Sequence, residues 1–206
     1  MAEEKIGLFD AIYTQRAIRS LKPDPIPDEI LVQIIEAATK APSGGNSQPW
    51  AFIVVKDPKS IAKIAEWGKA GFTAMYERAI ERLKPGDPLP FPRLKPMVEK
   101  LGDVPVFIFP CHVRGAGVAA APGGQSIYPA TQNMLLAARG LGIGAVLTNL
   151  ALGYSDEIKA LLNIPENVDL MATIPMGYPD KERYGSTTRK PVSEVTHWES
   201  WGEMRA

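Results

Sequence analysis

The sequence predicts an α+β fold with a helix-rich shell, and three observations carry that prediction. Two stretches, 28–40 and 127–142, repeat their apolar residues at helical spacing. Two β-branched and aromatic runs, 51–57 and 103–111, are typical of buried strands. Helical and strand patterns mix along the chain without an internal repeat or a linker, so we expect a single domain over residues 1–206.

The first expected element is a helix over residues 4–19. Leu8, Ala11 and Ile12 would share one side of it, and two arginines stand three apart at its end. The proline-rich stretch 21–27 ends any helix, because a residue that precedes proline is pushed into an extended conformation.

A second helix is expected to begin at Pro27 or Asp28. Its predicted buried face consists of Ile30, Leu31, Ile34, Ile35 and Ala38. The loop APSGGNSQPW, residues 41–50, follows this helix, and Gly44 and Gly45 are expected to supply its positive φ angles.

A third helix over 59–84 is weakened by Gly68 and Gly71. The segment 84–96, KPGDPLPFPRLKP, holds too many prolines for regular structure, and we interpret it as a surface insertion or lid. A glycine- and alanine-rich connector over 115–126 leads to the next helix.

The helix over 127–142 has a clear apolar face, with Gly142 as its C-terminal cap. That face consists of Ile127, Ala130, Thr131, Met134, Leu135 and Ala138. Two further strands are expected at 143–150 and 169–179, and between them Ser155 is expected to cap a short helix.

The composition excludes several classes of protein. Lys plus Arg and Asp plus Glu both number 23, which argues against a nucleic-acid or anionic-membrane partner. No apolar run approaches the roughly 18 residues of a membrane span, and the acidic N-terminus lacks a signal-peptide pattern. With one cysteine no intrachain disulfide can form, so we expect a cytoplasmic protein.

Two local patterns resemble functional motifs without their context. RGLGIGAV, at 139–146, has the glycines of a dinucleotide fingerprint, but here the helix precedes the strand, which reverses the Rossmann order. Cys111 and His112 are adjacent, and neighbours on a strand point to opposite faces. With only one other histidine in the chain, we expect no metal site and read both as structural.

The loop 41–50 carries more polar groups than a turn requires. Two glycines suffice for a turn, yet Ser43, Asn46, Ser47 and Gln48 crowd around them. Glycines allow backbone N–H groups to approach a ligand closely. Amides and hydroxyls beside them suit a flat heterocycle with carbonyls and ring nitrogens. The alternative is that the loop is only a turn.

Four basic residues form two pairs, Arg16 with Arg19 and Arg189 with Lys190. Any single one is more often a solvated surface residue than a ligand. If the fold brings the pairs together, they would form a phosphate clamp, for which arginine is well suited.

Together these motifs resemble the nitroreductase family of flavoenzymes. QRAIRSLKPDPIP, APSGGNSQPW and FIVV resemble its N-terminal signature, YPATQNMLLAARGLGIGAVLTN its central helix and strand, and RKPVSEVTHW its C-terminal segment. The resemblance implies a nitroreductase-like α+β fold, with a central mixed or antiparallel sheet surrounded by helices, in an intertwined homodimer. It also implies two FMN molecules at the subunit interface.

The resemblance further implies which residues bind the cofactor. The basic N-terminal motif would serve the phosphate and the isoalloxazine edge, the loop would reach the partner's flavin, and a backbone N–H after the central strand would face flavin N5. The set is Arg16, Ala17, Arg19, Pro42, Ser43, Gly44, Asn46, Gln48, Thr148, Asn149, Arg189 and Lys190, with Tyr128 beside the substrate. Gln15 and Ala17 stand where many members have Arg and Ser. The phosphate clamp therefore either has fewer ligands here or takes additional ligands from residues 58–122.

The implied function is that of an FMN-dependent oxidoreductase, which passes hydride from NADH or NADPH to an aromatic acceptor such as a nitroaromatic or a quinone. No catalytic side chain is expected, because the flavin carries the chemistry. One alternative is the same fold with another flavin reaction, such as flavin destruction, dehalogenation or substrate oxidation. Another is a non-enzymatic flavin-binding protein.

Overall fold

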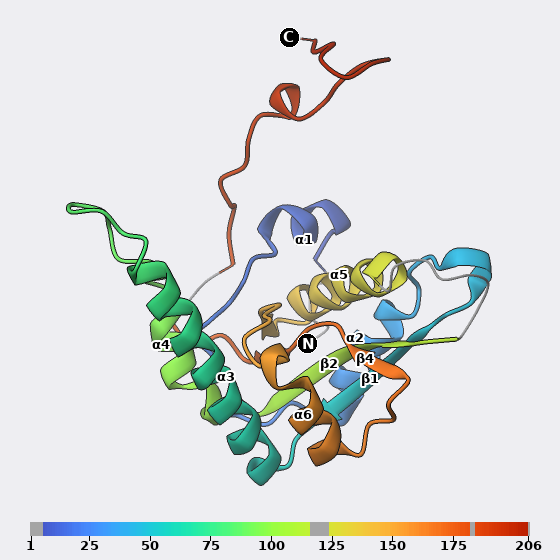
Figure 1. Ribbon diagram of the computed structural model, residues 1–206. Coiled ribbons are helices and arrows are strands. Elements are labelled where there is room, and N and C mark those ends of the chain that lie inside the picture. The colour runs from blue at the N-terminus through green and yellow to red at the C-terminus, as the bar shows by residue number, and fades with distance from the viewer. Residues whose placement is uncertain (1–5, 116–123, 182–183, 206) are drawn as a thin grey trace.

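The computed structural model describes residues 6–115, 124–181 and 184–205, and its centre is an antiparallel sheet (Figure 1). The strands follow the order β1-β2-β5-β3, and β4 pairs with β2. Their bounds are β1 Trp50–Val55, β2 Val106–Val113, β3 Gly144–Ala145, β4 Val168–Leu170 and β5 Ile174–Gly177. Every pair of strands runs antiparallel.

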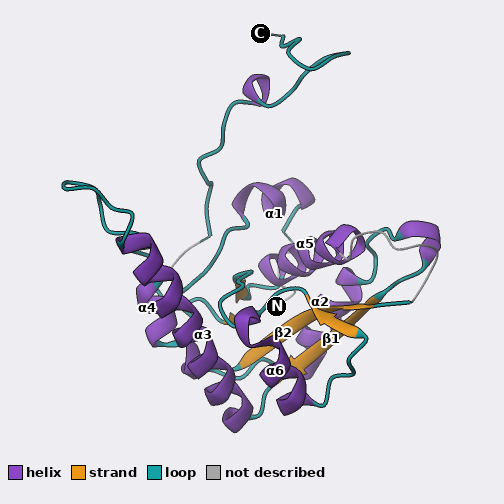
Figure 2. Ribbon diagram, viewed as in Figure 1, coloured by secondary structure: helices purple, strands orange, loops and turns teal. Residues whose placement is uncertain are grey.

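Helices cover both faces of the sheet (Figure 2). Helices α2 and α5 pack together on one face, and α3, α4 and α6 lie on the other. The helix bounds are α1 Leu8–Thr14, α2 Asp28–Ala38, α3 Pro58–Ile80, α4 Lys95–Glu99, α5 Gly124–Gly140 and α6 Ser155–Leu162. Short 3-10 turns occupy Gly44–Asn46, Leu101–Asp103, Leu152–Tyr154 and Val192–Glu194. The predicted α+β class, with helices around an antiparallel sheet, is confirmed.

The central strand β2 divides the interior into two cores. Successive side chains of a strand point to opposite faces, so Val106 and Ile108 join the core beneath α2 and α5, while Phe107 and Phe109 join the core beneath α3. All six residues predicted for the apolar face of α5 are buried, which confirms that face.

The first helix is shorter than predicted. Helix α1 ends at Thr14, and Gln15 is already extended, so Arg16 and Arg19 lie on extended chain rather than on a helix face. Hydrogen bonds to the sheet explain the early end. The N–H of Ile18 donates to the carbonyl of Ala145, and Ile18 is fully buried.

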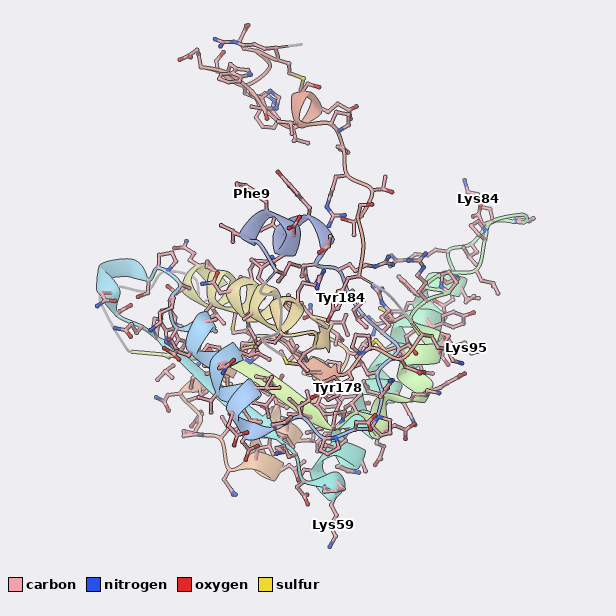
Figure 3. The ribbon with its side chains drawn as sticks, turned by 180° about the vertical axis from the view of Figure 1, so that it is seen from behind. Phe9, Lys59, Lys84, Lys95, Tyr178 and Tyr184 are labelled. Carbon is pink, nitrogen blue, oxygen red and sulfur yellow. The ribbon has the colours of Figure 1, made fainter. Side chains whose placement is uncertain are left out.

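The expectation that Leu8 and Ile12 form a buried side together with Ala11 was also wrong. Ala11 is buried, but Leu8 and Ile12 are exposed, as are Phe9 and Tyr13 beside them. Figure 3 shows Phe9 pointing away from the body of the molecule.

Several predicted details of the strands differ from the structure. β1 is mostly half-buried because it is an edge strand. The strand expected at 143–150 is reduced to β3. The strand expected at 169–179 is divided into β4 and β5, which both pair with β2. Pro110 stands on β2 between the two pairings and offers no N–H to the ladder, which accounts for the division.

The cap of α6 and the face of α2 also differ from the prediction. Ser155 is the first residue of α6 rather than its cap, and its hydroxyl donates back to the carbonyl of Leu152. On α2, Ile30 and Ile35 are only partly buried, although the other three predicted residues are buried.

The proline-rich segment leaves the body of the molecule between α3 and α4 (Figure 1). Its irregular part ends at Leu94, two residues earlier than predicted, because Lys95 and Pro96 form the first turn of α4, where proline is tolerated. Most of the predicted connector 115–126 lies outside the described residues. Among the helices that the structure describes, none has the length and apolar character needed to cross a membrane.

The buried Cys111 gives a first testable prediction. Burial raises the pKa of its thiol from 9.0 to about 12, so the reactive thiolate is scarce in the folded state. We expect a thiol reagent to label the native protein much more slowly than the urea-unfolded protein. Because the folded pKa is the higher one, Cys111 should also lower the free energy of unfolding as pH rises from about 9 to about 12. Equal labelling rates in the two states would contradict the burial.

Candidate cofactor site

Two adjoining cavities lie beside the extended chain that follows α1, and Arg19 lines both of them. The first has a volume of about 680 Å³ and is lined by Arg16, Arg19, Ser20, Pro92, Arg93, Pro96, Met97, Glu99, Lys100, Lys181 and Tyr184. The second, of about 540 Å³, is lined by α3, by residues 146–150 and by Tyr154. Of the predicted site residues, the structure therefore brings together Arg16, Arg19, Thr148 and Asn149.

The first cavity is strongly cationic. Arg16 and Arg19 are half-buried in its wall, and three exposed cations, Arg93, Lys100 and Lys181, complete its lining. Among the described residues that line it, Glu99 is the one carboxylate. Such a cavity favours a ligand that carries phosphate or carboxylate.

Tyr184 also lines the first cavity. It lies against the body of the domain (Figure 3), and the guanidinium of Arg139 lies 4.1 Å from the centre of its ring. Burial raises the pKa of its hydroxyl to about 12, although the charge of Arg139 opposes that shift. This hydroxyl is buried and has no hydrogen-bond partner among the described residues.

The second cavity is lined mainly by apolar residues, together with Arg19 and Arg78. Small residues of α3, Ala70, Gly71 and Ala74, form one wall and allow the helix to approach the segment 146–150. A Cβ atom on Gly71 would stand 1.9 Å from the carbonyl oxygen of Leu150. The apolar residues of this lining suit an apolar or aromatic part of a ligand.

Thr148 and Asn149 differ in their exposure at this second cavity. Thr148 is buried and exchanges two backbone hydrogen bonds with Thr173, at 3.0 and 2.8 Å. Its hydroxyl accepts a hydrogen bond from the N–H of Leu150 at 3.0 Å. Asn149 is exposed. The predicted segment after the central strand is therefore rigid at Thr148 and open at Asn149.

Ala17 lies between the two arginines in sequence but not at either cavity. Its side chain packs against the core beneath α3, as expected for an alternating extended chain. A serine hydroxyl in this place would face that core.

The loop 41–50 lies at the far end of the molecule from α3 and α4 (Figure 1). Its predicted ligands Pro42, Ser43, Gly44, Asn46 and Gln48 do not line either cavity of their own chain. Positive φ falls on Gly45, Asn46 and Gln48, so the prediction for Gly44 was wrong.

Side-chain hydrogen bonds explain how this loop holds its shape. The N–H of Gln48 donates to the Ser43 hydroxyl at 3.0 Å, and the Gln48 side-chain amide donates to Asn46 at 3.2 Å. Asparagine tolerates the left-handed region better than most residues. Hydrogen bonds within the loop therefore fix its conformation, and the polar side chains of Asn46 and Gln48 are exposed to solvent.

The other three predicted site residues lie apart from the cavities within one chain. Arg189 and Lys190 are exposed on the C-terminal tail, which leaves the body of the molecule, and the Arg189 guanidinium donates to the carbonyl of Thr188 at 2.9 Å. Tyr128 is about half exposed on α5, and its hydroxyl is 3.5 Å from the Met171 carbonyl.

Sequence reasoning identified Arg16 and Arg19 of the first cavity, and the lining residues it missed include Arg93, Lys100, Lys181 and Tyr184. They come from three separate segments. Three of them are basic and one is aromatic, and no sequence pattern links them. The density of basic residues in 93–100 was visible, but nothing in the sequence places them beside Arg16. Among the described residues, no group of three or more His, Cys, Asp or Glu side chains could hold a metal ion.

The fold and the cavities define a class of protein: an α+β domain with a cationic cavity joined to one lined mainly by apolar residues, suited to a ligand with an anionic group and an apolar part. The chain belongs to the nitroreductase family, whose model matches residues 12–178.

Relatives and solved structures agree with this membership. An Archaeoglobus fulgidus protein, provisionally assigned as an NADH dehydrogenase/NAD(P)H nitroreductase, is 34% identical over 92% of this chain and 96% of its own. The iodotyrosine deiodinase of Thermotoga neapolitana is 29% identical over 84% of this chain and 89% of its own. A provisionally assigned nitroreductase from Desulfovibrio desulfuricans, solved in complex with FMN, superposes with a TM-score of 0.70 at 25% identity, covering 95% and 98% of the two chains.

Proposed function

We propose that the protein is an FMN-dependent oxidoreductase that takes hydride from NADH or NADPH and reduces an aromatic acceptor such as a quinone or a nitroaromatic. One observation carries the proposal. Arg16 and Arg19, singled out from the sequence, line a cationic cavity, and Arg19 also lines a second cavity whose other residues are mainly apolar. Family membership and the FMN-bound solved relative support the same cofactor.

The donor set of the two cavities fits FMN. Arg16 would hold the phosphate, for which a guanidinium is well suited. Arg19 lines both cavities, so it would sit between the phosphate and the ring and stabilise negative charge on the ring edge. Thr148 and Asn149 would orient the ring along the segment 146–150. When bound, FMN supplies the hydride and electron transfer.

The protein's own contribution is binding, orientation and a fixed positive charge. For a quinone the balance is NAD(P)H plus a proton plus quinone, giving NAD(P)⁺ and hydroquinone. A half-buried arginine is preorganised, so it stabilises developing negative charge without rearranging. The predicted roles of the loop 42–48, Tyr128, Arg189 and Lys190 require a second chain or a moved tail, and they stay predictions.

Steady-state kinetics test the proposal. The cavities offer one apolar ring site, so donor and acceptor should use it in turn. We expect parallel double-reciprocal lines when a quinone is varied at several fixed NADH or NADPH concentrations. Intersecting lines would indicate a ternary complex and a separate second site, and the absence of NAD(P)H consumption with any acceptor would remove the proposed activity.

We also propose a homodimer, because apolar side chains lie uncovered on two segments. Leu8, Phe9, Ile12 and Tyr13 on α1 are 45–67% exposed, and Trp198 and Trp201 on the tail are 43% and 89% exposed. Exposed aromatic residues of this kind are enriched at interfaces. Met134 and Leu135 on α5 are buried within their own chain and supply no such surface.

Sedimentation should therefore give about twice the chain mass of 22.4 kDa. Replacing Phe9 and Tyr13 by serine should weaken the dimer, since both side chains are largely exposed within one chain and their loss leaves its core intact. Replacement of the equally exposed Val32 by serine, on α2, is the matched control. A flavin-loaded monomer at micromolar concentration would contradict the proposed interface.

Reductive dehalogenation is a second candidate reaction, favoured by the similarity to the Thermotoga iodotyrosine deiodinase. Halide release from an iodinated phenol under reducing conditions would distinguish it. Release that outpaces quinone reduction would make dehalogenation the main activity.

A further inference from the structure

The first cavity holds more positive charge than the sequence motif supplies. Gln15 and Ala17, the neighbours of Arg16, are uncharged, so the motif brings only two cations to the cavity. Three others, Arg93, Lys100 and Lys181, come from the end of the proline-rich segment, from the residue after α4 and from the chain after β5. Segments that are distant in sequence therefore place positively charged side chains around the same cavity.

These cations are not balanced by the protein itself. Within the described part of the chain, Arg16, Arg93, Lys100 and Lys181 make no ion pair, and Glu99, which lines the same cavity, pairs with none of the four. Elsewhere on the surface, lysines do find carboxylates, as Lys56 does with Asp28. Like charges around one cavity repel each other unless an anion joins them.

On this basis, and resting on the proposed function, we propose that Arg93 and Lys100, with Lys181, complete the phosphate site for FMN. Arg93 and Lys100, which lie just before and just after α4, would then bind the cofactor, while α4 itself packs against α3. A phosphate group carries about −1.5 to −2 charge near neutral pH and presents three acceptor oxygens, which several flexible cations can share with Arg16. Recognition of the phosphate would be divided between the N-terminal motif, the two residues that flank α4 and the chain after β5.

A comparison of FMN with riboflavin distinguishes binding of the phosphate from binding of the ring, because riboflavin has the same ring system and no phosphate. The test measures the Kd of FMN and of riboflavin, by flavin fluorescence, for the full-length protein freed of flavin and for Arg93→Ala/Lys100→Ala. The matched control is Arg82→Ala/Lys95→Ala, which removes the same charge from nearby exposed positions that line neither this cavity nor the second.

We expect the Arg93→Ala/Lys100→Ala variant to raise the Kd of FMN by about 10- to 100-fold, on the scale of lost charge-assisted hydrogen bonds. The Kd of riboflavin should change less than about 2-fold, and the control should leave both constants nearly unchanged. Added salt should weaken FMN binding in the wild type more than in the variant.

Other outcomes would overturn the inference in distinguishable ways. If the wild type binds FMN and the variant binds it equally well, the phosphate is held elsewhere and only this inference fails. A rise in the NADPH KM with unchanged FMN affinity would assign the cations to the nucleotide donor. If the wild type binds neither flavin, the proposed function fails as well.

Discussion

Replacing Arg16 and Arg19 together by alanine should abolish stable FMN binding, with a Kd at least about 100-fold above that of the wild type. Each charge-assisted hydrogen bond lost costs about 1.5–3 kcal/mol, although neighbouring charges do not add simply. Arg16 lines the cationic cavity and Arg19 lines both cavities, so the double variant removes the phosphate contact and the charge between the two. The purified variant should be colourless and should regain little flavin on titration.

Single variants and a control define the roles of the two arginines. Arg16→Ala should weaken FMN more than riboflavin, whereas Arg19→Ala should weaken both, because Arg19 also lines the ring cavity. Arg82→Ala, an exposed arginine outside both cavities, should leave the two constants unchanged. A double variant that retains FMN with wild-type affinity would place the cofactor somewhere else.

Replacing Gly71 by alanine should destabilise the protein by about 3 kcal/mol, in the range known for overpacked interiors. A glycine-to-alanine change within a helix normally stabilises by up to about 1 kcal/mol. Here the sign reverses, because the new Cβ would stand 1.9 Å from the Leu150 carbonyl oxygen, and backbone cannot move as a side chain can. The shift would also widen the cavity that Gly71 lines, so flavin affinity should fall with stability.

Two other glycines give a graded comparison by urea unfolding. A Cβ on Gly68 would meet the Leu101 side chain at 2.6 Å, which is flexible, so Gly68→Ala should cost less than Gly71→Ala. Gly153→Ala meets nothing within 4 Å and should be nearly neutral. Equal midpoints for Gly71→Ala and Gly153→Ala would show that α3 does not approach residue 150 as closely as described.

The regular elements that bury one face could be predicted from the sequence, because periodicity reports burial directly. The apolar face of α5 was visible for that reason, and the continuous apolar run of β2 indicated a strand buried on both faces. The end of α1 was not, since it depends on hydrogen bonds that Ile18 makes to Ala145, far along the chain. The division of the last strand likewise depends on where Pro110 falls opposite it.

The candidate site was predictable where a local motif carries it and unpredictable where the fold assembles it. Arg16 and Arg19 stand in one motif, and they line the same cavity. Arg93, Lys100 and Lys181 follow no pattern, and only the packing of α4 beside the extended chain reveals them. The role predicted for the loop 42–48 depends on a second chain, and that of Arg189 on a second chain or a moved tail; a single sequence positions neither.

An anaerobic titration of the purified protein with NADH and NADPH, followed by its visible absorbance, tests the central claim most directly. The account predicts a yellow protein whose flavin absorbance is lost on addition of about one equivalent of at least one nicotinamide per bound flavin, and returns when a quinone is added. A protein that binds no added FMN, or whose bound flavin neither nicotinamide reduces, would contradict the account.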